Sequence, residues 1–450
     1  MARTFTDILF RKELASIRDE ELVQLLYADF GPEIDHLKGV PRAVEGDGNP
    51  PKGNLTENGF SPSRLLFGED FDEVNRTITN VRAVKWLFAN EYEAFTANQP
   101  AVVKLSPKTF QELRERVLPS WEDPDYLLAL IVALVVGDMG KDPHLAGEIA
   151  ARQSTGDKHD HENHDECLAE AVECGILDKP LSRLSDARRE EVVLGINVGA
   201  TLNIPQLTQG ENVPGSLQPL LRFRGHRAHG EAFNIKYQEI IFDVSGAGGH
   251  LDSRGATRMI EPVCQSFLQA WPILSDVITN ERSLREAYDA VLQNRGELIA
   301  EKGFPLLSPT DPSHRALLRL FAMGRVADQA TAEQFQDAFQ GLSDTTREAL
   351  INGMNVDGIN DGNAVVLYYM PALFAETLRV LRTASSEDRV IALQSLMGFM
   401  VRSFDGSKPQ PDQLGSIKER NVSPAVDLVR SQAFHDNLRL LDDYTLPEES

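Results

Sequence analysis

The longest apolar run in the sequence is the feature that most restricts the fold. It extends from Tyr126 to Val136, follows Asp123-Pro124 and stops at Gly137. Pro at the first turn and Gly at the end are typical of the start and stop of a helix. The run is shorter than the ~18 apolar residues that a membrane span needs, so it predicts a helix buried in a protein core.

Helical periodicity extends through most of the remaining chain. Few segments alternate with the period of two that strands require, which favours helices. Helices are predicted over residues 1–38, 71–95, 108–118, 164–175, 185–202 and 232–244 and over most of 257–300 and 313–441, with irregular segments at 39–64 and 203–230. We therefore predict a mainly α fold with N-terminal helices and a long loop in residues 1–120, a helical core in 121–300 and a C-terminal helical region in 301–450.

Composition limits the kind of partner. The chain contains 68 Asp and Glu against 45 Lys and Arg, a formal net charge of -23. This excess repels phosphate backbones and argues against binding of extended duplex DNA. The three cysteines form no Cys-x-x-Cys pair, which argues against a disulfide framework, and the N-terminus has no apolar signal segment. These observations predict a cytoplasmic protein with no membrane partner, and they leave the oligomeric state open.

Acidic and histidine side chains follow the apolar run. Asp138 comes directly after Gly137, residues 159–166 contain three His and four acids, and Asp243 ends a second apolar stretch. Carboxylate and imidazole are ligands for Mn, Fe or Zn. Each group has an equally good structural explanation: Asp138 fits a helix end, residues 159–166 fit a solvated loop before a helix, and Asp243 fits a helix boundary. The candidate metal ligands are Asp138, His161, His164 and Asp243.

The segment Gly137-Asp138-Met139-Gly140-Lys141 resembles the signature of the HD superfamily of helical metal-dependent phosphohydrolases. In that superfamily, His-Asp ends a buried helix and a His-His-Glu-x-x-Asp pattern follows. Gly137 stands where the metal-binding His is expected, and Asp160 stands in place of the first His of the second pattern. The resemblance implies an HD-like helical core that has lost one metal ligand, with Asp243 as the acid on a late helix.

A second acidic cluster lies near the N-terminal end of the helix predicted over residues 71–95. Glu69-Asp70-Phe71-Asp72-Glu73 places four acids in five residues, shortly after Ser61. Paired carboxylates bind the planar guanidinium of arginine in a bidentate manner. The same pattern also fits a helix N-terminus, where acids are favoured by the helix dipole.

This cluster is similar to an Asp-Asp-x-x-Glu motif of the fungal arginine-containing cyclodipeptide synthases, with Glu69 in place of the first Asp. That resemblance implies a transferase of secondary metabolism that needs no cofactor. It would join arginine and a second amino acid, delivered by arginyl-tRNA and another aminoacyl-tRNA, into a cyclic dipeptide. Gly59-Phe60-Ser61-Pro62-Ser63 resembles the serine loop of bacterial cyclodipeptide synthases, in which Ser accepts the first aminoacyl group. A basic run at residues 222–229 is a candidate contact for the acceptor stem.

Under this reading, each acidic residue has an expected role. Asp70 and Glu73 handle arginine at the catalytic site and Asp138 relays protons, while Glu69, Asp72 and Ser61 contribute to substrate binding.

Three hypotheses follow. The first is an aminoacyl-transferring cyclodipeptide synthase on a degenerate HD-like scaffold. The second is a metal-dependent phosphohydrolase or oxygenase, with a divalent metal such as Mn, Fe or Zn. The third is a non-catalytic helical binding protein. The first requires that residues 59–73 meet residues 138–166 in one site, and the third expects the acidic clusters to lie apart.

Overall fold

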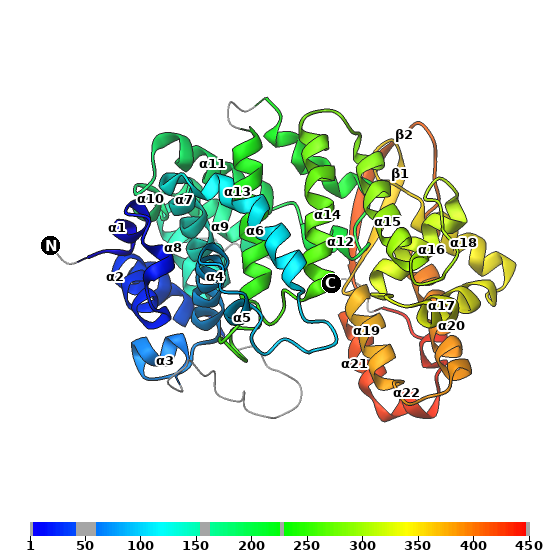
Figure 1. The fold of residues 1–450 in the computed structure, drawn as a ribbon. Coiled ribbons are helices and arrows are strands. Elements are labelled where there is room, and N and C mark those ends of the chain that lie inside the picture. Colours follow the sequence, from blue (N-terminus) through cyan, green and yellow to red (C-terminus); the bar gives the residue numbers. More distant parts are fainter. Residues whose placement is uncertain (1–2, 42–59, 154–162, 226–228, 447–450) are drawn as a thin grey trace. The chain divides into compact units, whose positions relative to one another are not determined.

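The computed structural model describes residues 3–41, 60–153, 163–225 and 229–446, and its fold is mainly α (Figure 1). The predicted fold class is therefore confirmed. The chain divides into two compact units: unit 1 contains Met1–Leu202 and Arg222–Trp271, and unit 2 contains Asn203–Leu221 and Pro272–Ser450. The predicted boundary after residue 120 falls inside a helix of unit 1, and the one after residue 300 falls at the end of a helix of unit 2. Neither coincides with a boundary between the two units.

Unit 1 is built from helices and short 3-10 turns in its described residues. They are α1 (Phe5–Phe10), η1 (Leu14–Ser16), α2 (Asp19–Lys38), α3 (Pro62–Phe67), α4 (Asp72–Phe88), α5 (Tyr92–Phe95), α6 (Pro107–Trp121), α7 (Pro124–Val136), η2 (Met139–Lys141), α8 (Pro143–Gln153), α9 (His164–Glu173), α10 (Asp178–Leu181), α11 (Asp186–Gly199) and α13 (His229–Gly246). Helix α14 (Glu261–Ile278) and the 3-10 segment η3 (Pro214–Phe223) contain boundaries between the units.

Helix α7 is the centre of unit 1. Every residue from Tyr126 to Val136 is buried, and the helix packs against α4, α11 and α13. A helix that is apolar on all sides needs neighbours on all sides, which explains why the longest apolar run lies at this position. Asp123 caps the helix by accepting a hydrogen bond from the backbone N–H of Asp125.

Glycines let α4 approach the end of α13. A Cβ atom on Gly246 would lie 1.8 Å from Asn80 Oδ1 and 2.6 Å from the carbonyl oxygen of Arg76, and one on Gly249 would lie 2.6 Å from Thr79 Oγ1. The glycine-rich turn after α13 therefore serves close helix packing. This contact fixes the position of the first turns of α4 against α13.

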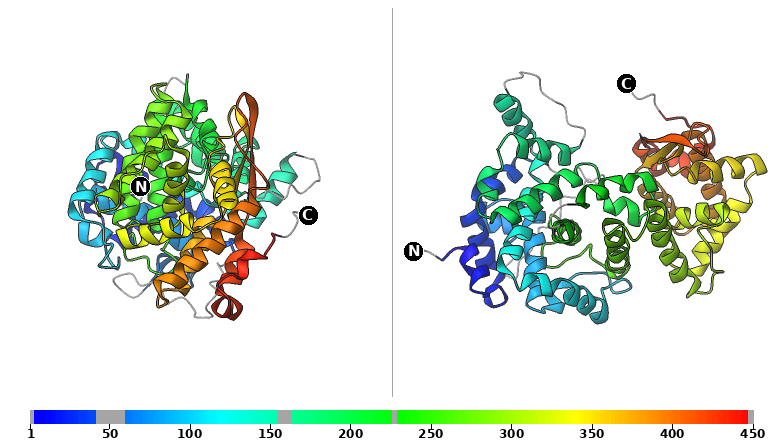
Figure 2. Two further views of the ribbon diagram at one scale, coloured as in Figure 1. Left: turned by 90° about the vertical axis from the view of Figure 1, so that its right-hand side faces the viewer. Right: turned by 90° about the horizontal axis from the view of Figure 1, so that it is seen from above.

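Unit 2 combines helices with two strands. Its elements are α12 (Ile204–Thr208), α15 (Leu284–Ala300), α16 (Pro312–Met323), α17 (Gln329–Gln340), α18 (Asp344–Met354), β1 (Asp361–Tyr368), α19 (Met370–Val380), α20 (Ser386–Ser403), β2 (Gln413–Asn421), α21 (Ser423–Arg430), α22 (Gln432–Asp436) and η4 (Leu440–Asp442). The strands β1 and β2 pair in parallel, with Val366 opposite Glu419, and the yellow-to-red elements that surround them are visible from two further directions in Figure 2. The sequence pattern did not predict either strand.

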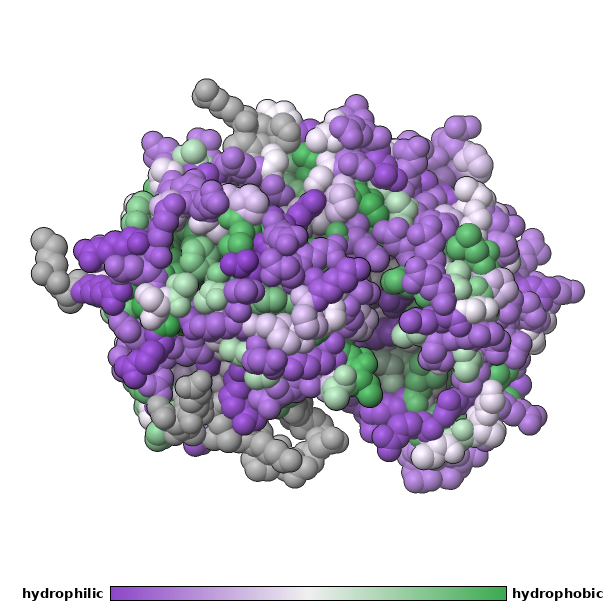
Figure 3. All heavy atoms as spheres, viewed as in Figure 1, coloured by the Kyte–Doolittle hydropathy of each residue, from purple (hydrophilic) through white to green (hydrophobic). Residues whose placement is uncertain are grey.

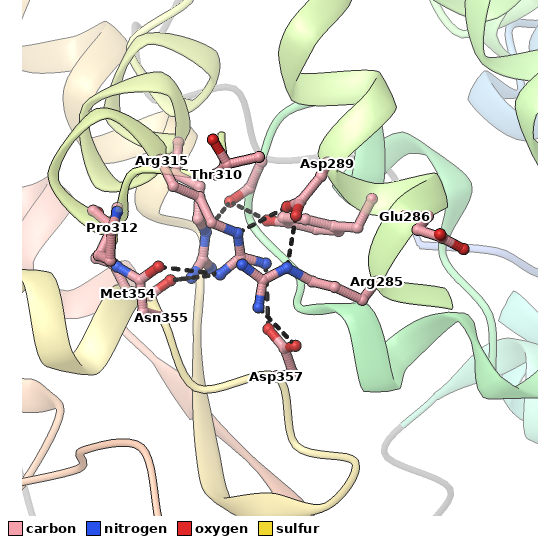
Figure 4. A network of polar contacts seen from close by, with 12 residues as sticks. Arg285, Glu286, Asp289, Thr310, Pro312, Arg315, Met354, Asn355 and Asp357 are labelled. Atoms are coloured by element: carbon pink, nitrogen blue, oxygen red, sulfur yellow. Dashed lines mark hydrogen bonds and ion pairs between the residues drawn. The ribbon is translucent and has the colours of Figure 1, made fainter. Parts of the chain in front are cut away.

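Buried arginines hold the interior of unit 2 together. Arg315, on α16, lies 2.7 Å from Asp289 and 3.2 Å from Asp357, and these side chains point toward one another and toward Arg285 in Figure 4. Arg319 donates to the carbonyl oxygen of Asn212 at 3.0 Å. The segment 203–221 is thereby tied to the C-terminal helices, which explains why it belongs to unit 2.

The surface view is mainly hydrophilic, with separate apolar patches (Figure 3). None of the described helices combines the length and the apolar character that a membrane span requires.

The contact between α4 and α13 predicts that replacement by Ala has opposite effects on stability at Gly246 and at Gly147. Gly246→Ala should lower the free energy of unfolding by about 2–3 kcal/mol, because the new methyl group must push the backbone of α4 away. Gly147→Ala, at a position in α8 with open space around it, should raise the free energy of unfolding by up to about 1 kcal/mol through helix propensity. Urea denaturation of both variants measures this, and equal stability of the two would contradict the packing role of Gly246.

Candidate functional site

Four elements of unit 1 bring charged side chains to one place. Glu73 lies in the first turn of α4, Asp138 lies between α7 and η2, and Lys141 ends η2. Asp243 lies in the last turn of α13. Residues 59–73 and 138–166 therefore do meet, through Glu73 and Asp138.

Lys141 bridges the two acids. Its Nζ lies 2.7 Å from Glu73 Oε1 and 2.6 Å from Asp138 Oδ1. Arg76, one turn after Glu73 on α4, places Nη1 at 3.1 Å from Glu73 Oε2. We call Glu73, Arg76, Asp138, Lys141 and Asp243 the acid–base cluster.

Asp243 joins the acid–base cluster electrostatically. Asn80, on α4, donates to Asp243 Oδ1 at 3.2 Å. The Asp243 side chain is exposed, but partial desolvation by its neighbours and the negative charge of Asp138 raise its pKa.

Glu73 and Asp138 share a proton. Their exposed fractions are 4% and 7%. Burial raises the pKa of Glu73 to about 7, assisted by the charge of Asp138 and by the hydrogen bond that the protonated Glu73 donates to Asp138. Burial disfavours charge on Asp138 as well, but the Lys141 ammonium and the hydrogen bond from Glu73 hold the pKa of Asp138 below its usual range.

This arrangement is suited to general acid–base chemistry. A carboxyl group with a pKa near neutrality can both accept and return a proton at physiological pH. The neighbouring Lys141 and Arg76 side chains are 23% and 30% exposed, so the acid–base cluster reaches solvent on the side of its cations. The described geometry therefore supports proton transfer to and from a bound molecule.

A second ion pair lies beside Gly137. Lys236 Nζ contacts Glu239 Oε1 at 3.0 Å, both on α13. A Cβ atom on Gly137 would lie 3.3 Å from Glu239 Oε1. A side chain at position 137 would need the Glu239 carboxylate to shift, so Gly137 leaves room for this ion pair.

Ser61 and Asp70 form a separate local arrangement. Ser61 is fully buried and caps α3 by accepting from the backbone N–H of Arg64. Its hydroxyl donates to Asp70 Oδ1 at 2.5 Å, and Arg64 Nε lies 2.7 Å from Asp70 Oδ2. Asp70 thus holds an arginine of the chain itself, as Glu73 does.

The other two acids of this segment lie differently. Glu69 is exposed, whereas Asp72 is half-buried at the first residue of α4. The structure thus brings Glu73 to Asp138 and leaves Glu69 at the surface.

The candidate metal ligands are only partly described. His161 lies outside the described residues, and His164 is 40% exposed, with Nε2 at 3.6 Å from Asp165. Within the described part of the chain, no three His, Cys, Asp or Glu side chains come together in a group that could hold a metal ion. The cation beside Asp138 is the Lys141 ammonium. The metal site stays a prediction.

Gly140, within the signature, and Asp142, directly after it, have structural roles. Asp142 accepts from the backbone N–H of His144 at the start of α8 and lies 2.8 Å from His36 Nδ1. A Cβ atom on Gly140 would lie 1.9 Å from the carbonyl oxygen of His164. Gly140 therefore allows α9 to pack against η2.

Sequence reasoning missed Arg76, Asn80, Lys236 and Glu239. Arg76 and Asn80 follow Glu73 by three and seven positions, so they share its face of α4, and this spacing was a usable signal. Lys236 and Glu239 are charged residues inside an apolar helix, which indicates buried pairing.

Residues 23–441 match the family described as "Family of unknown function (DUF6829)". The chain therefore belongs to this family, since the match covers most of its length. Neither the curated proteins nor the solved structures contain a significant match to the chain.

The shared proton predicts a dependence of stability on pH. Folded Glu73 keeps its proton between the ordinary pKa of about 4.5 and about 7, whereas the unfolded chain loses it, so the stability of the wild type falls as pH rises through this window. Glu73→Gln cannot ionise. The free energy of unfolding of Glu73→Gln, measured relative to that of the wild type, should therefore be larger at pH 8 than at pH 4.5 by about 3 kcal/mol.

Urea denaturation at several pH values measures this difference, and the exposed Glu69→Gln serves as the matched control. Parallel pH profiles for Glu73→Gln and the wild type would show that Glu73 does not titrate near neutrality.

Proposed function

We propose that this member of the DUF6829 family is an aminoacyl-transferring synthase that joins arginine and a second amino acid into a cyclic dipeptide. The meeting of Glu73 with Asp138, bridged by Lys141, carries this proposal. The synthase hypothesis needs the acidic segment and the end of α7 in a single site, and the contact of Glu73 with Lys141 and Asp138 supports it.

The proton-sharing pair suits the chemistry of acyl transfer. The α-amine of one aminoacyl group attacks the ester carbonyl of the other, a C–N bond forms and the C–O bond to the tRNA ribose breaks. The pair of Glu73 and Asp138 accepts the proton of the amine and returns a proton to the departing ribose oxygen. A second attack, by the free amine of the dipeptidyl ester on its own ester carbonyl, closes the ring and releases the second tRNA.

Two arginine contacts support recognition of a guanidinium. Arg64 lies 2.7 Å from Asp70, and Arg76 lies 3.1 Å from Glu73. The acids assigned to the substrate arginine therefore already bind guanidinium groups of the chain itself. In this proposal the substrate arginine exchanges with one of these side chains, and Ser61 orients Asp70 through its hydrogen bond.

Mass spectrometry of small molecules from an expressing host tests the proposal. Wild-type protein should produce an arginine-containing cyclic dipeptide, and Glu73→Gln should reduce it by at least about 100-fold, the usual contribution of a general acid–base group. Glu69→Gln, a matched change at an exposed acid, should keep most of the product.

Two results would overturn this proposal. The first is the absence of any cyclic dipeptide with the wild type. The second is an equimolar Mn, Fe or Zn content of the purified protein, accompanied by phosphate-ester hydrolysis that Asp138→Asn abolishes. The second result would establish the metal-dependent alternative.

A further inference from the structure

A buried ion pair on α13 lies next to the acid–base cluster without being part of it. Lys236 and Glu239 are each 9% exposed, and Lys236 Nζ contacts Glu239 Oε1 at 3.0 Å. Glu239 precedes Asp243 by four residues on the helix, so the two share one face. Glu239 also lies beside Gly137, the residue directly before Asp138. The ion pair is therefore a neighbour of two acids of the acid–base cluster.

Most of the hydrogen-bonding capacity of this ion pair is unused. An ammonium group carries three donors, and each carboxylate oxygen can accept. In the described part of the chain, Lys236 donates to Glu239 alone, and Glu239 Oε2 accepts from no side chain or backbone group. Buried polar groups normally have partners, so these donors and this acceptor call for an explanation.

Two glycines leave room around the charged ends of the pair. A Cβ atom on Gly199, in α11, would lie 2.7 Å from Lys236 Nζ, and one on Gly137 would lie 3.3 Å from Glu239 Oε1. A Cβ atom on Gly195, one turn earlier in α11, would make only an ordinary contact of 3.4 Å with Lys236 Cβ. The ammonium and the carboxylate therefore each meet bare backbone rather than a neighbouring side chain.

Stability does not explain why these two positions are charged. A buried ion pair loses much of its attraction to the cost of leaving water, and apolar residues of similar size are often as stable or more stable in its place. The other buried side chains of α13 are mostly apolar, such as Phe233, Ile241 and Phe242. The charged pair is better explained by a ligand that uses its remaining donors and its remaining acceptor.

We propose that Lys236 and Glu239 form a subsite that binds the amino and carbonyl groups of an aminoacyl group. The α-ammonium donates to Glu239 Oε2, and the carbonyl oxygen accepts from Lys236 Nζ. A single carbon separates these two groups in every aminoacyl group, which suits a donor and an acceptor in direct contact with each other. The inference rests on the proposed function and deepens it, because the subsite holds an amino acid by its main chain and leaves its side chain unselected.

Isothermal titration calorimetry with leucine amide tests the subsite, because this probe carries both groups and no reactive ester. The wild type should bind leucine amide at least about tenfold more tightly than isoamylamine, which lacks the carbonyl, and than isocaproamide, which lacks the amine. Equal affinity for the three probes, or no binding of leucine amide, would overturn the proposal.

Variants connect the binding to the ion pair. Lys236→Met/Glu239→Gln removes both charges together, so that no isolated charge stays buried, and should weaken binding of leucine amide at least about tenfold. Gly199→Ala displaces the ammonium without removing it and should also weaken binding. Gly195→Ala is the matched control on the same helix and should keep the wild-type affinity.

Thermal unfolding without ligand shows whether each variant is folded, and the two glycine variants test the proposal even where the double variant does not fold. Wild-type affinity in the folded double variant, or an equal loss of affinity in Gly199→Ala and Gly195→Ala, would show that the probe does not bind through the ion pair.

The product assay separates this inference from the proposed function. Binding of leucine amide that depends on the ion pair, in a protein that makes no cyclic dipeptide, would support the subsite and overturn the synthase. Wild-type production of the cyclic dipeptide by Lys236→Met/Glu239→Gln would support the synthase and overturn the subsite.

Discussion

The central interaction of unit 1 is the contact of two buried carboxyl groups with one ammonium. Glu73 and Asp138 cannot both ionise in a buried position without a cation, and the Lys141 ammonium lies within 2.7 Å of each. Glu73 is buried, and the cations Lys141 and Arg76 do not fully compensate the three carboxylates of the acid–base cluster, so Glu73 keeps its proton near neutrality. The chemical capacity of the site follows from this imbalance.

Helix packing creates this excess of carboxyl groups over cations. The apolar helix α7 ends at Val136 inside the core, two residues before Asp138, and the glycines at the end of α13 allow α4 to bring Glu73 into contact with Asp138. A second ion pair, Lys236 with Glu239, fills the space beside Gly137. The segment that resembles a metal-binding signature is thus surrounded by ammonium and guanidinium groups of the chain itself.

Part of this arrangement could be predicted from the sequence. The apolar run defined α7 within two residues, and the same run placed Asp138 just after its buried end. The partner of Asp138 could not be predicted, because the contact with Glu73 depends on how α4 packs across α13. Lys236 and Glu239 stand as charged residues in an apolar helix, which indicates that they pair in the core, but the sequence does not show that the pair lies beside Gly137.

The strands of unit 2 were missed for a different reason. All nine residues of β2 are exposed or half-buried, so its side chains show no alternation between a core face and a solvent face. The residues of β1 from Ala364 to Leu367 are buried without interruption, and a short apolar run does not distinguish a strand from a helix. Their pairing became evident only from the backbone register.

The most direct test of the account is a titration of the Glu73 carboxyl group by carbon-13 NMR, with labelled glutamate and with Glu73→Gln to assign the resonance. The account predicts a midpoint of about 7 for this carboxyl and a shift toward about 4.5 in Asp138→Asn, because the variant removes the charge that retains the proton. A midpoint near 4.5 in the wild type, or one that Asp138→Asn leaves unchanged, would contradict the claim that Glu73 and Asp138 act as one unit.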